Sequence, residues 1–192
     1  MRFDRKRFFD GMRRSFGPVS NLQASALEFL LTAFEDDGRF CDVRWIAYAL
    51  GTIKHETANT YDPIREHGGA AYFLRYEGRR DLGNIEPGDG PRYCGRGYVQ
   101  ITGRANYQYF TERLGVDLIS DPDEAMRQSI AYSIMAIGMT EGRFTGRKLS
   151  HYIDGDRCDY VGARRIVNAQ DKAQLIASYA AKFEAILSAS NS

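Results

Sequence analysis

The stretch 60–103 constrains the fold of this chain more than any other feature of its sequence. It holds nine of the 19 glycines and three of the five prolines. Glycine and proline disfavour both helix interiors and central strands, so neither can run through it. Long irregular segments are uncommon inside a domain unless they carry function. We therefore expect a functional loop with a small β element, for which residues 98–102 are the candidate strand.

Helical patterns flank this loop on both sides. Apolar residues and capping signals predict helices over about 3–16, 21–34, 42–57, 104–114, 121–139 and 171–187. Gly115 stands in the usual stop position of the fourth helix. Asp, Pro, Asp and Glu at 121–124 form a strong helix start. The predicted fold class is mainly α, with residues 1–192 as a single domain and no linker or repeat.

The overall charge excludes several classes of function. With 26 basic and 25 acidic residues, the net charge is +1, too small for a protein-wide field that binds nucleic acid. Three cysteines, an odd number, argue against a disulfide framework. No apolar run approaches the roughly 18 residues of a membrane span, and no secretory signal opens the chain. We expect synthesis in the cytoplasm and no stable membrane insertion.

The first 20 residues are an exception, because they carry a net charge of +4. Phe8, Met12 and Phe16 are spaced as on one face of a basic amphipathic helix. We expect that face to pack on the core. The alternative is a weak anchor to an anionic polymer or to lipid headgroups.

Glu56 is the first candidate for chemistry. It lies near the end of the 42–57 helix, on the side that carries Ala49 and Ile53. Partial burial raises the pKa of a carboxyl group, which suits a general acid. The alternative is a solvated surface glutamate.

Metal and nucleophile chemistry find little support. His55 and Glu56 match half of the zinc-peptidase helix motif, but Asn59 occupies the position of its second histidine. The cysteines lack paired spacing, and no serine elbow is present. We therefore expect neither a metal nor a cofactor.

A second carboxylate is expected from the loop, where Glu66 and Glu77 are the leading candidates. Both are flanked by arginines, which favour the ionised form: Arg65, Arg75, Arg79 and Arg80. Two carboxyls in different environments are what glycoside hydrolysis requires. A solvated charged loop is the alternative.

The segment 93–107 combines glycines with neutral polar and aromatic side chains. Gly95 and Gly97 allow close approach of the backbone to a ligand. The polar candidates are Gln100, Thr102 and Asn106, and the aromatic ones, expected to offer flat faces, are Tyr93, Tyr98 and Tyr107. This mixture suits a sugar polymer better than a phosphate or a metal.

HET at 55–57, followed by GRGYVQITGRANY at 95–107, resembles the family 19 chitinases. Within them the chain is most similar to phage and prophage chitinase-like endolysins, from about residue 3 to 187. The resemblance implies an α+β lysozyme-like fold with a cleft, and hydrolysis with inversion of β-1,4 bonds between amino sugars. Inverting enzymes hold their two carboxyls about 6.5–9.5 Å apart.

The resemblance also implies roles for single residues. Glu56 matches the general acid, and Thr102 the residue that helps to hold the attacking water. The general base falls at Glu77 by the plant pattern and at Glu66 by the phage pattern, PIREHGG at 63–69. The remaining matches are substrate-binding residues of the cleft: His55, Tyr93, Gln100, Asn106, Tyr107 and Asn168. Asn168 lies in a departure from the family, since IVNAQ at 166–170 lacks the expected glycines.

These matches predict a monomeric endolysin that acts on the glycan strands of peptidoglycan, without a separate wall-binding domain. It would be made in the host bacterial cytoplasm and reach the cell wall through a separate membrane pore. The alternatives are a true chitinase acting on chitin and a non-catalytic saccharide-binding phage protein.

Overall fold

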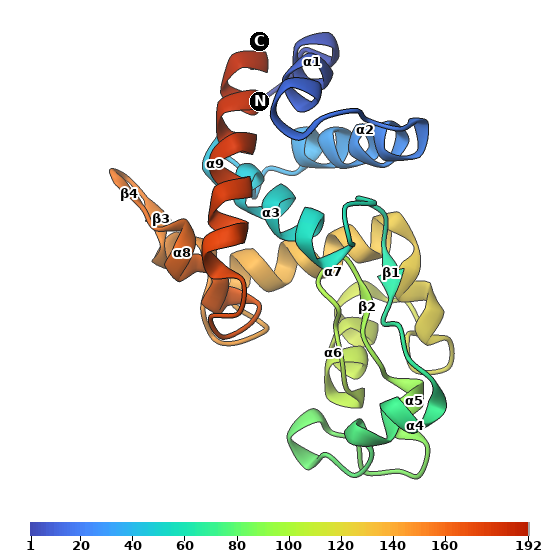
Figure 1. Ribbon diagram of the computed structural model, residues 1–192. Coiled ribbons are helices and arrows are strands. Elements are labelled where there is room, and N and C mark those ends of the chain that lie inside the picture. Colours follow the sequence, from blue (N-terminus) through green and yellow to red (C-terminus); the bar gives the residue numbers. More distant parts are fainter. Residues whose placement is uncertain (192) are drawn as a thin grey trace. The chain divides into compact units, whose positions relative to one another are not determined.

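The computed structural model describes residues 1–191 and consists mainly of helices (Figure 1). The longer helices are α1 (Arg5–Phe16), α2 (Asn21–Asp36), α3 (Val43–Glu56), α6 (Arg104–Leu114), α7 (Gln128–Glu141) and α9 (Ala173–Ser190). The four-residue helices are α4 (Ala70–Phe73), α5 (Asp89–Arg92) and α8 (Tyr160–Ala163). The 3-10 helices are η1 (Leu74–Tyr76), η2 (Arg80–Leu82), η3 (Pro122–Met126), η4 (Leu149–His151) and η5 (Arg164–Ile166).

Two antiparallel strand pairs complete the fold. β1 (Ile64–Arg65) pairs with β2 (Arg96–Gly97), and β3 (Ile153–Asp154) pairs with β4 (Arg157–Cys158). The predicted class, mainly α with a small β element in the glycine-rich loop, is confirmed.

The chain forms two compact units. The first, which we call the helical unit, comprises Met1–Tyr61 and the chain from Met135 onwards. The second, which we call the loop unit, comprises Asp62–Ile134 and contains most of the glycine-rich stretch. The prediction that the chain acts as a single catalytic domain stays a prediction.

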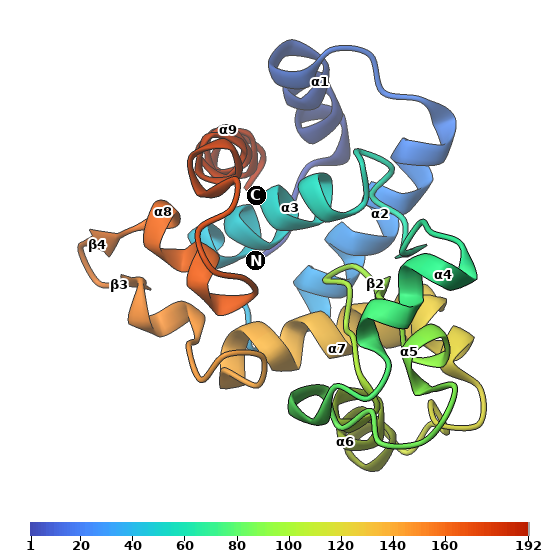
Figure 2. The ribbon, with the colours of Figure 1, turned by 60° about the horizontal axis from the view of Figure 1, so that its bottom comes forward.

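The core of the helical unit lies where α9 packs against α3, with α1 and α8 also against α9 (Figure 2). Every residue of α3 from Ile46 to Ile53 is buried. Gly51 allows the close contact with α9, because a Cβ there would lie 3.0 Å from the backbone nitrogen of Ala180. A helix buried all round is typical of a core element, and here its last residue is Glu56.

The predicted helix ends are largely confirmed because they depend on local interactions. Ser20 and Gln23 form a capping box at the start of α2, and the Asp42 side chain caps α3. Gly115 ends α6 in the left-handed conformation, with φ of 67°.

The basic N-terminal helix packs as expected, with Phe8 and Met12 of α1 buried. The chain before it forms a β-bridge from Phe3 to Asn191, so the two termini lie side by side in Figure 1. The expectation that the phenylalanine face packs on the core is therefore confirmed.

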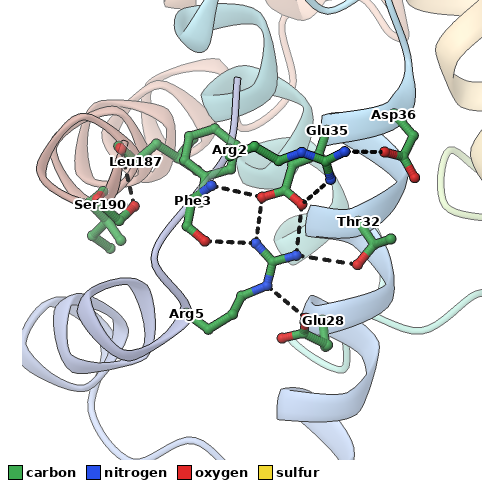
Figure 3. Close-up of polar contacts among 10 residues, drawn as sticks. Arg2, Phe3, Arg5, Glu28, Thr32, Glu35, Asp36, Leu187 and Ser190 are labelled. Atoms are coloured by element: carbon green, nitrogen blue, oxygen red, sulfur yellow. Dashed lines mark hydrogen bonds and ion pairs between the residues drawn. The ribbon is translucent and has the colours of Figure 1, made fainter. Parts of the chain in front are cut away.

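An arginine–carboxylate network fixes α1 to α2 (Figure 3). The Glu35 carboxylate accepts hydrogen bonds from Arg5 Nη1 at 2.5 Å, Arg5 Nη2 at 2.9 Å and Phe3 N at 2.7 Å. Arg2 Nη1 adds a contact of 3.2 Å, and Arg5 Nε donates to Glu28 at 2.7 Å. The hydrogen bonds from Arg5 lower the pKa of Glu35 to about 2 against the opposing effect of burial.

We expect Glu35→Gln to destabilise the protein by about 3 kcal/mol at neutral pH, since each pKa unit corresponds to about 1.4 kcal/mol. Because the folded pKa is depressed, this stability is present above the ordinary value of 4.5 and lost as the pH falls toward 2. Urea unfolding of wild type and variant should therefore converge in acid. Glu28→Gln, at a half-exposed carboxylate on the same arginine, should cost much less.

The prediction of one helix over 121–139 is wrong. The start is capped by the Asp121 side chain, but the turn that follows is the 3-10 helix η3, and Arg127 is extended before α7 begins. A tertiary contact competes with the local helix signal here, because the Asp123 carboxylate binds the buried Arg96 side chain at 2.7 Å.

The predicted strand over 98–102 is also wrong. The chain reverses there, and Arg96 and Ile101 exchange backbone hydrogen bonds of 3.3 and 3.0 Å. Gln100 has a φ of 54°, which a strand does not allow. The strand is limited to β2, just before this turn.

Candidate active site

In the helical unit, Glu56 is held by a buried arginine. It ends α3, and Oε1 accepts a hydrogen bond of 2.6 Å from Arg164 Nη1. Arg164 is 1% exposed, and its Nε donates to the Asp171 carbonyl at 3.0 Å. Arg164 was not predicted from the sequence. Its one signal there is that it precedes residues 166–170, which depart from the family pattern.

The other candidates of this unit are more exposed. His55 lies partly exposed in the last turn of α3. Asn168 is exposed, its backbone N–H donates to the Arg164 carbonyl, and its side chain accepts from Ala169 N at 2.8 Å. Asn168 is thus fixed to the turn that carries Arg164.

In the loop unit, Glu66 follows β1 and is held by three donors. Oε1 accepts from Arg75 Nη2 at 2.6 Å and from the Tyr76 hydroxyl at 2.9 Å. Oε2 accepts from Gly95 N at 3.1 Å, while Glu66 N donates to the Gly95 carbonyl at 2.8 Å. The pairing of β1 with β2 places Glu66 opposite Gly95.

Glu66 lines an open cavity of about 750 Å³. Its apolar lining includes Phe73, Pro91 and Met126, and its polar lining includes Arg65 and His67 on either side of Glu66. The Glu66 side chain is 17% exposed, so a bound molecule or a water can reach it. Carboxylate, cations and apolar wall together suit an amphipathic, polar-edged ligand.

The neutral candidates adjoin this carboxylate. Gln100 Nε2 donates to the Ile64 and Gly97 carbonyls at 2.8 and 3.0 Å. Thr102 Oγ1 donates to the Gln100 carbonyl at 3.0 Å, and Asn106 Nδ2 donates to the Thr102 carbonyl at 2.8 Å.

The Glu66 and Gln100 side chains approach each other at Gly95. A Cβ there would lie 2.9 Å from Gln100 Oε1 and 3.1 Å from Glu66 Oε2. The structure therefore brings together Glu66, Gln100, Thr102 and Asn106 within one unit, and glycine at 95 is needed for the approach.

Glu77 has a different environment. Its two carboxylate oxygens accept from Gly88 N at 2.6 Å and Gly90 N at 2.8 Å. It does not line the cavity around Glu66. Glu77 fastens the loop in front of α5, and a Cβ on Gly90 would lie 2.8 Å from its Oε2.

The expectation that the three tyrosines offer flat faces is wrong. Tyr93, Tyr98 and Tyr107 are at most 1% exposed. The Tyr107 hydroxyl donates to the Cys94 carbonyl at 2.8 Å and accepts from Arg96 Nη1 at 3.0 Å. Burial raises the pKa of Tyr107 above its ordinary value. These contacts brace the turn that carries Gln100, and direct binding of substrate by Tyr93 and Tyr107 stays a prediction.

Within residues 1–191, no group of three or more His, Cys, Asp or Glu side chains is placed to hold a metal ion. In the same part of the chain, no helix is both long and apolar enough to cross a membrane.

Known proteins resemble the chain in part of its sequence. Chitinase 11 of Oryza sativa subsp. japonica is 34% identical over 80 residues, and an acidic endochitinase of Petunia hybrida is 37% identical over 79. These matches cover 42% and 41% of this chain but only 28% of each relative. No protein-family model matches the chain.

The fold is similar over nearly the whole length. Chitinase C from Streptomyces griseus has a TM-score of 0.65 at 17% identity, covering 97% of this chain and 92% of that one. A bacterial family 19 chitinase has a TM-score of 0.57 at 18% identity, covering 96% and 94%. None of the proteins named here is a phage endolysin, so that part of the resemblance stays a prediction. The chain therefore has the α-rich fold of these chitinases, and its sequence is similar to plant chitinases over about 80 residues.

Proposed function

We propose that this chain is a glycoside hydrolase that cuts β-1,4 bonds between amino sugars of bacterial peptidoglycan by an inverting mechanism. The observation that carries the proposal is Glu66, which lines the open cavity of the loop unit and accepts a hydrogen bond from Gly95 N, with Gln100 close to the same glycine. The partial sequence similarity to plant chitinases and the shared fold support the glycosidase part.

In this mechanism Glu56 is the general acid. It would protonate the oxygen that leaves the cleaved sugar. Arg164 fixes one carboxylate oxygen at 2.6 Å, which sets the orientation of the group. Within residues 1–191, the other carboxylate oxygen of Glu56, Oε2, has no arginine contact, and we assign this atom to proton transfer.

Glu66 is the general base that activates the attacking water. We assign the base to Glu66 because it lines the open cavity and is 17% exposed, so that a water can reach it. The arginine contact does not by itself distinguish the two carboxylates, since Glu56 has one as well. Thr102, whose hydroxyl is tied to the Gln100 carbonyl, is assigned to help position the water.

The charges around the cavity favour peptidoglycan over chitin as the substrate. Arg65 lines the cavity, and its side chain is 49% exposed, with its Nη1 at 3.9 Å from the exposed Asp123 carboxylate. Chitin is neutral, whereas the peptide stems of peptidoglycan carry carboxylates that an exposed guanidinium can bind. We assign Arg65 to such a carboxylate.

Mass spectrometry of digested wall polymers tests this function. We expect purified Gram-negative sacculi to yield soluble muropeptides with new reducing ends, and the first anomer formed to be inverted. Chitin oligomers should be cut much more slowly. Rapid chitin cleavage with intact sacculi would identify a chitinase, and binding to sacculi without new reducing ends would identify a saccharide-binding module.

The role as an endolysin is part of the same proposal. Protein made in the bacterial cytoplasm would reach the wall through a separate membrane pore. Expression alone should therefore leave cells turbid, and permeabilising the inner membrane should cause rapid lysis. Lysis without permeabilisation would contradict this route.

A further inference from the structure

A groove between α1 and α9 in the helical unit has no part in the proposed catalysis. Its volume is about 210 Å³. It is lined by Arg7, Gly11 and Arg14 of α1 and by Ala185, Ile186 and Ala189 of α9.

Small residues make the groove. Gly11 sits directly on Ile186, because a Cβ there would lie 3.0 Å from the Ile186 side chain. Ala185 and Ala189 are exposed, and because their side chains are short, the groove is shallow on the side of α9. Arg7 and Arg14 lie seven residues apart on one helix face, so their Cα atoms are separated by about 10 Å along the axis.

The two groove arginines differ from the other cations of α1. Arg5 binds Glu28 and Glu35, while Lys6 and Arg13 bind Asp10. Within residues 1–191, the Arg7 and Arg14 side chains form no hydrogen bond or ion pair, and both residues are exposed. Arg14 is nevertheless among the weaker causes that lower the pKa of Asp10.

The surroundings of the groove add positive charge. Its lining contains no acidic residue. Lys182 of α9 reaches the adjoining Ser15 carbonyl at 3.4 Å, which places a further ammonium group at the end of α1. Two exposed guanidinium groups across a shallow, acid-free hollow form a site for a phosphate group, with which guanidinium makes paired hydrogen bonds.

We propose that this groove binds the phosphate of an anionic lipid headgroup and holds the protein reversibly at a membrane surface. An open site binds a single dissolved phosphate poorly, since water competes for both arginines. A lipid surface presents many phosphates at once, and its negative potential also attracts Lys6 and Arg13 on the same helix. The apolar face of α1 is already buried on the core, so charge rather than insertion carries the contact.

Co-sedimentation with vesicles tests the proposal, using phosphatidylcholine with and without phosphatidylglycerol. Wild type should bind only the anionic vesicles, and less at higher salt. The double variant Arg7→Gln, Arg14→Gln should bind more than about 100-fold more weakly, since it loses the general attraction of two charges, about 30-fold, together with the paired hydrogen bonds to phosphate.

The matched control is Lys6→Gln, Arg13→Gln, which removes the same charge from the same helix but outside the groove. It should weaken binding about 30-fold, the general attraction of two charges, and an equal loss in both double variants would overturn the site. Ala189→Leu keeps every charge and fills the exposed groove, so it should weaken binding as well. Unchanged binding by that variant would also overturn the proposal.

Two further measurements separate this site from other sources and from catalysis. Inorganic phosphate, compared with chloride at equal ionic strength, should not displace the protein from vesicles; displacement would identify a soluble-phosphate site instead. Digestion of purified sacculi should proceed at the wild-type rate in Arg7→Gln, Arg14→Gln, because neither residue lines the cavity at Glu66 or has a role in the proposed mechanism. If the protein does not bind vesicles, the proposed hydrolase function is not affected. If it does not digest sacculi, the proposed membrane contact is not affected.

Discussion

Replacing Glu56 with glutamine is expected to lower the rate of peptidoglycan hydrolysis about 10²–10⁴-fold, the usual cost of losing a general acid. Glutamine has nearly the same shape and keeps an amide oxygen that can accept the hydrogen bond from Arg164. It cannot donate a carboxyl proton to the leaving oxygen. The rate would be measured as reducing ends released from purified sacculi.

The fold of this variant should remain intact, because the residues before position 56 in α3 provide the buried contacts. Circular dichroism and thermal unfolding would establish that. Glu112→Gln is a suitable control, since it removes an exposed carboxylate on α6 that accepts a hydrogen bond from Gln108 of the same helix. If Glu56→Gln retains near-wild-type turnover while folded, Glu56 is not the acid and the mechanism must be abandoned.

The parts of the fold that could be predicted from sequence are those encoded over a few neighbouring residues. Ser20 with Gln23, Asp42 and Gly115 cap or end their helices through contacts within four residues. Such signals do not depend on the rest of the chain. The helices α2, α3 and α6 therefore begin and end close to their predicted bounds.

The features that could not be predicted from sequence depend on contacts between residues far apart in the chain. Arg164 meets Glu56 across 108 positions in the chain, and no local pattern marks it. Arg96 is buried and binds Asp123, which helps to shape both the turn after β2 and the break before α7. The tyrosines near Gly95 suggested a stacking surface, yet burial makes them part of the support.

The candidate site shows the same division. The phage-type pattern at 63–69 and the block at 95–107 pointed to Glu66, Gln100, Thr102 and Asn106, which all lie in the loop unit. Hydrogen bonds connect Asn106 to Thr102 and Thr102 to Gln100, while Glu66 and Gln100 bond to neighbouring backbone groups. Spacing alone left Glu66 and Glu77 equivalent. The cavity distinguishes them, since Glu66 lines it, whereas Glu77 lies outside its lining and accepts hydrogen bonds from two backbone N–H groups.

This difference yields the second large effect. Glu66→Gln should reduce hydrolysis of sacculi about 10²-fold or more, because an amide cannot take a proton from the attacking water. One of its three donors would then face an amide NH2, so a loss of about 1 kcal/mol of stability is expected as well. Sacculus digestion and urea unfolding would be measured on the same preparation.

Glu77→Gln is the matched comparison, as an identical change at a carboxylate in the same unit. It should keep most of the hydrolytic rate and lose about 1–2 kcal/mol of stability, because Gly88 N or Gly90 N loses a charge-assisted acceptor. The two variants thus separate the two roles: similar costs in stability, but a large loss of rate only at Glu66. The opposite pattern, with the rate lost at Glu77 and kept at Glu66, would assign the base to Glu77 and make Glu66 a brace for the turn at Gly95.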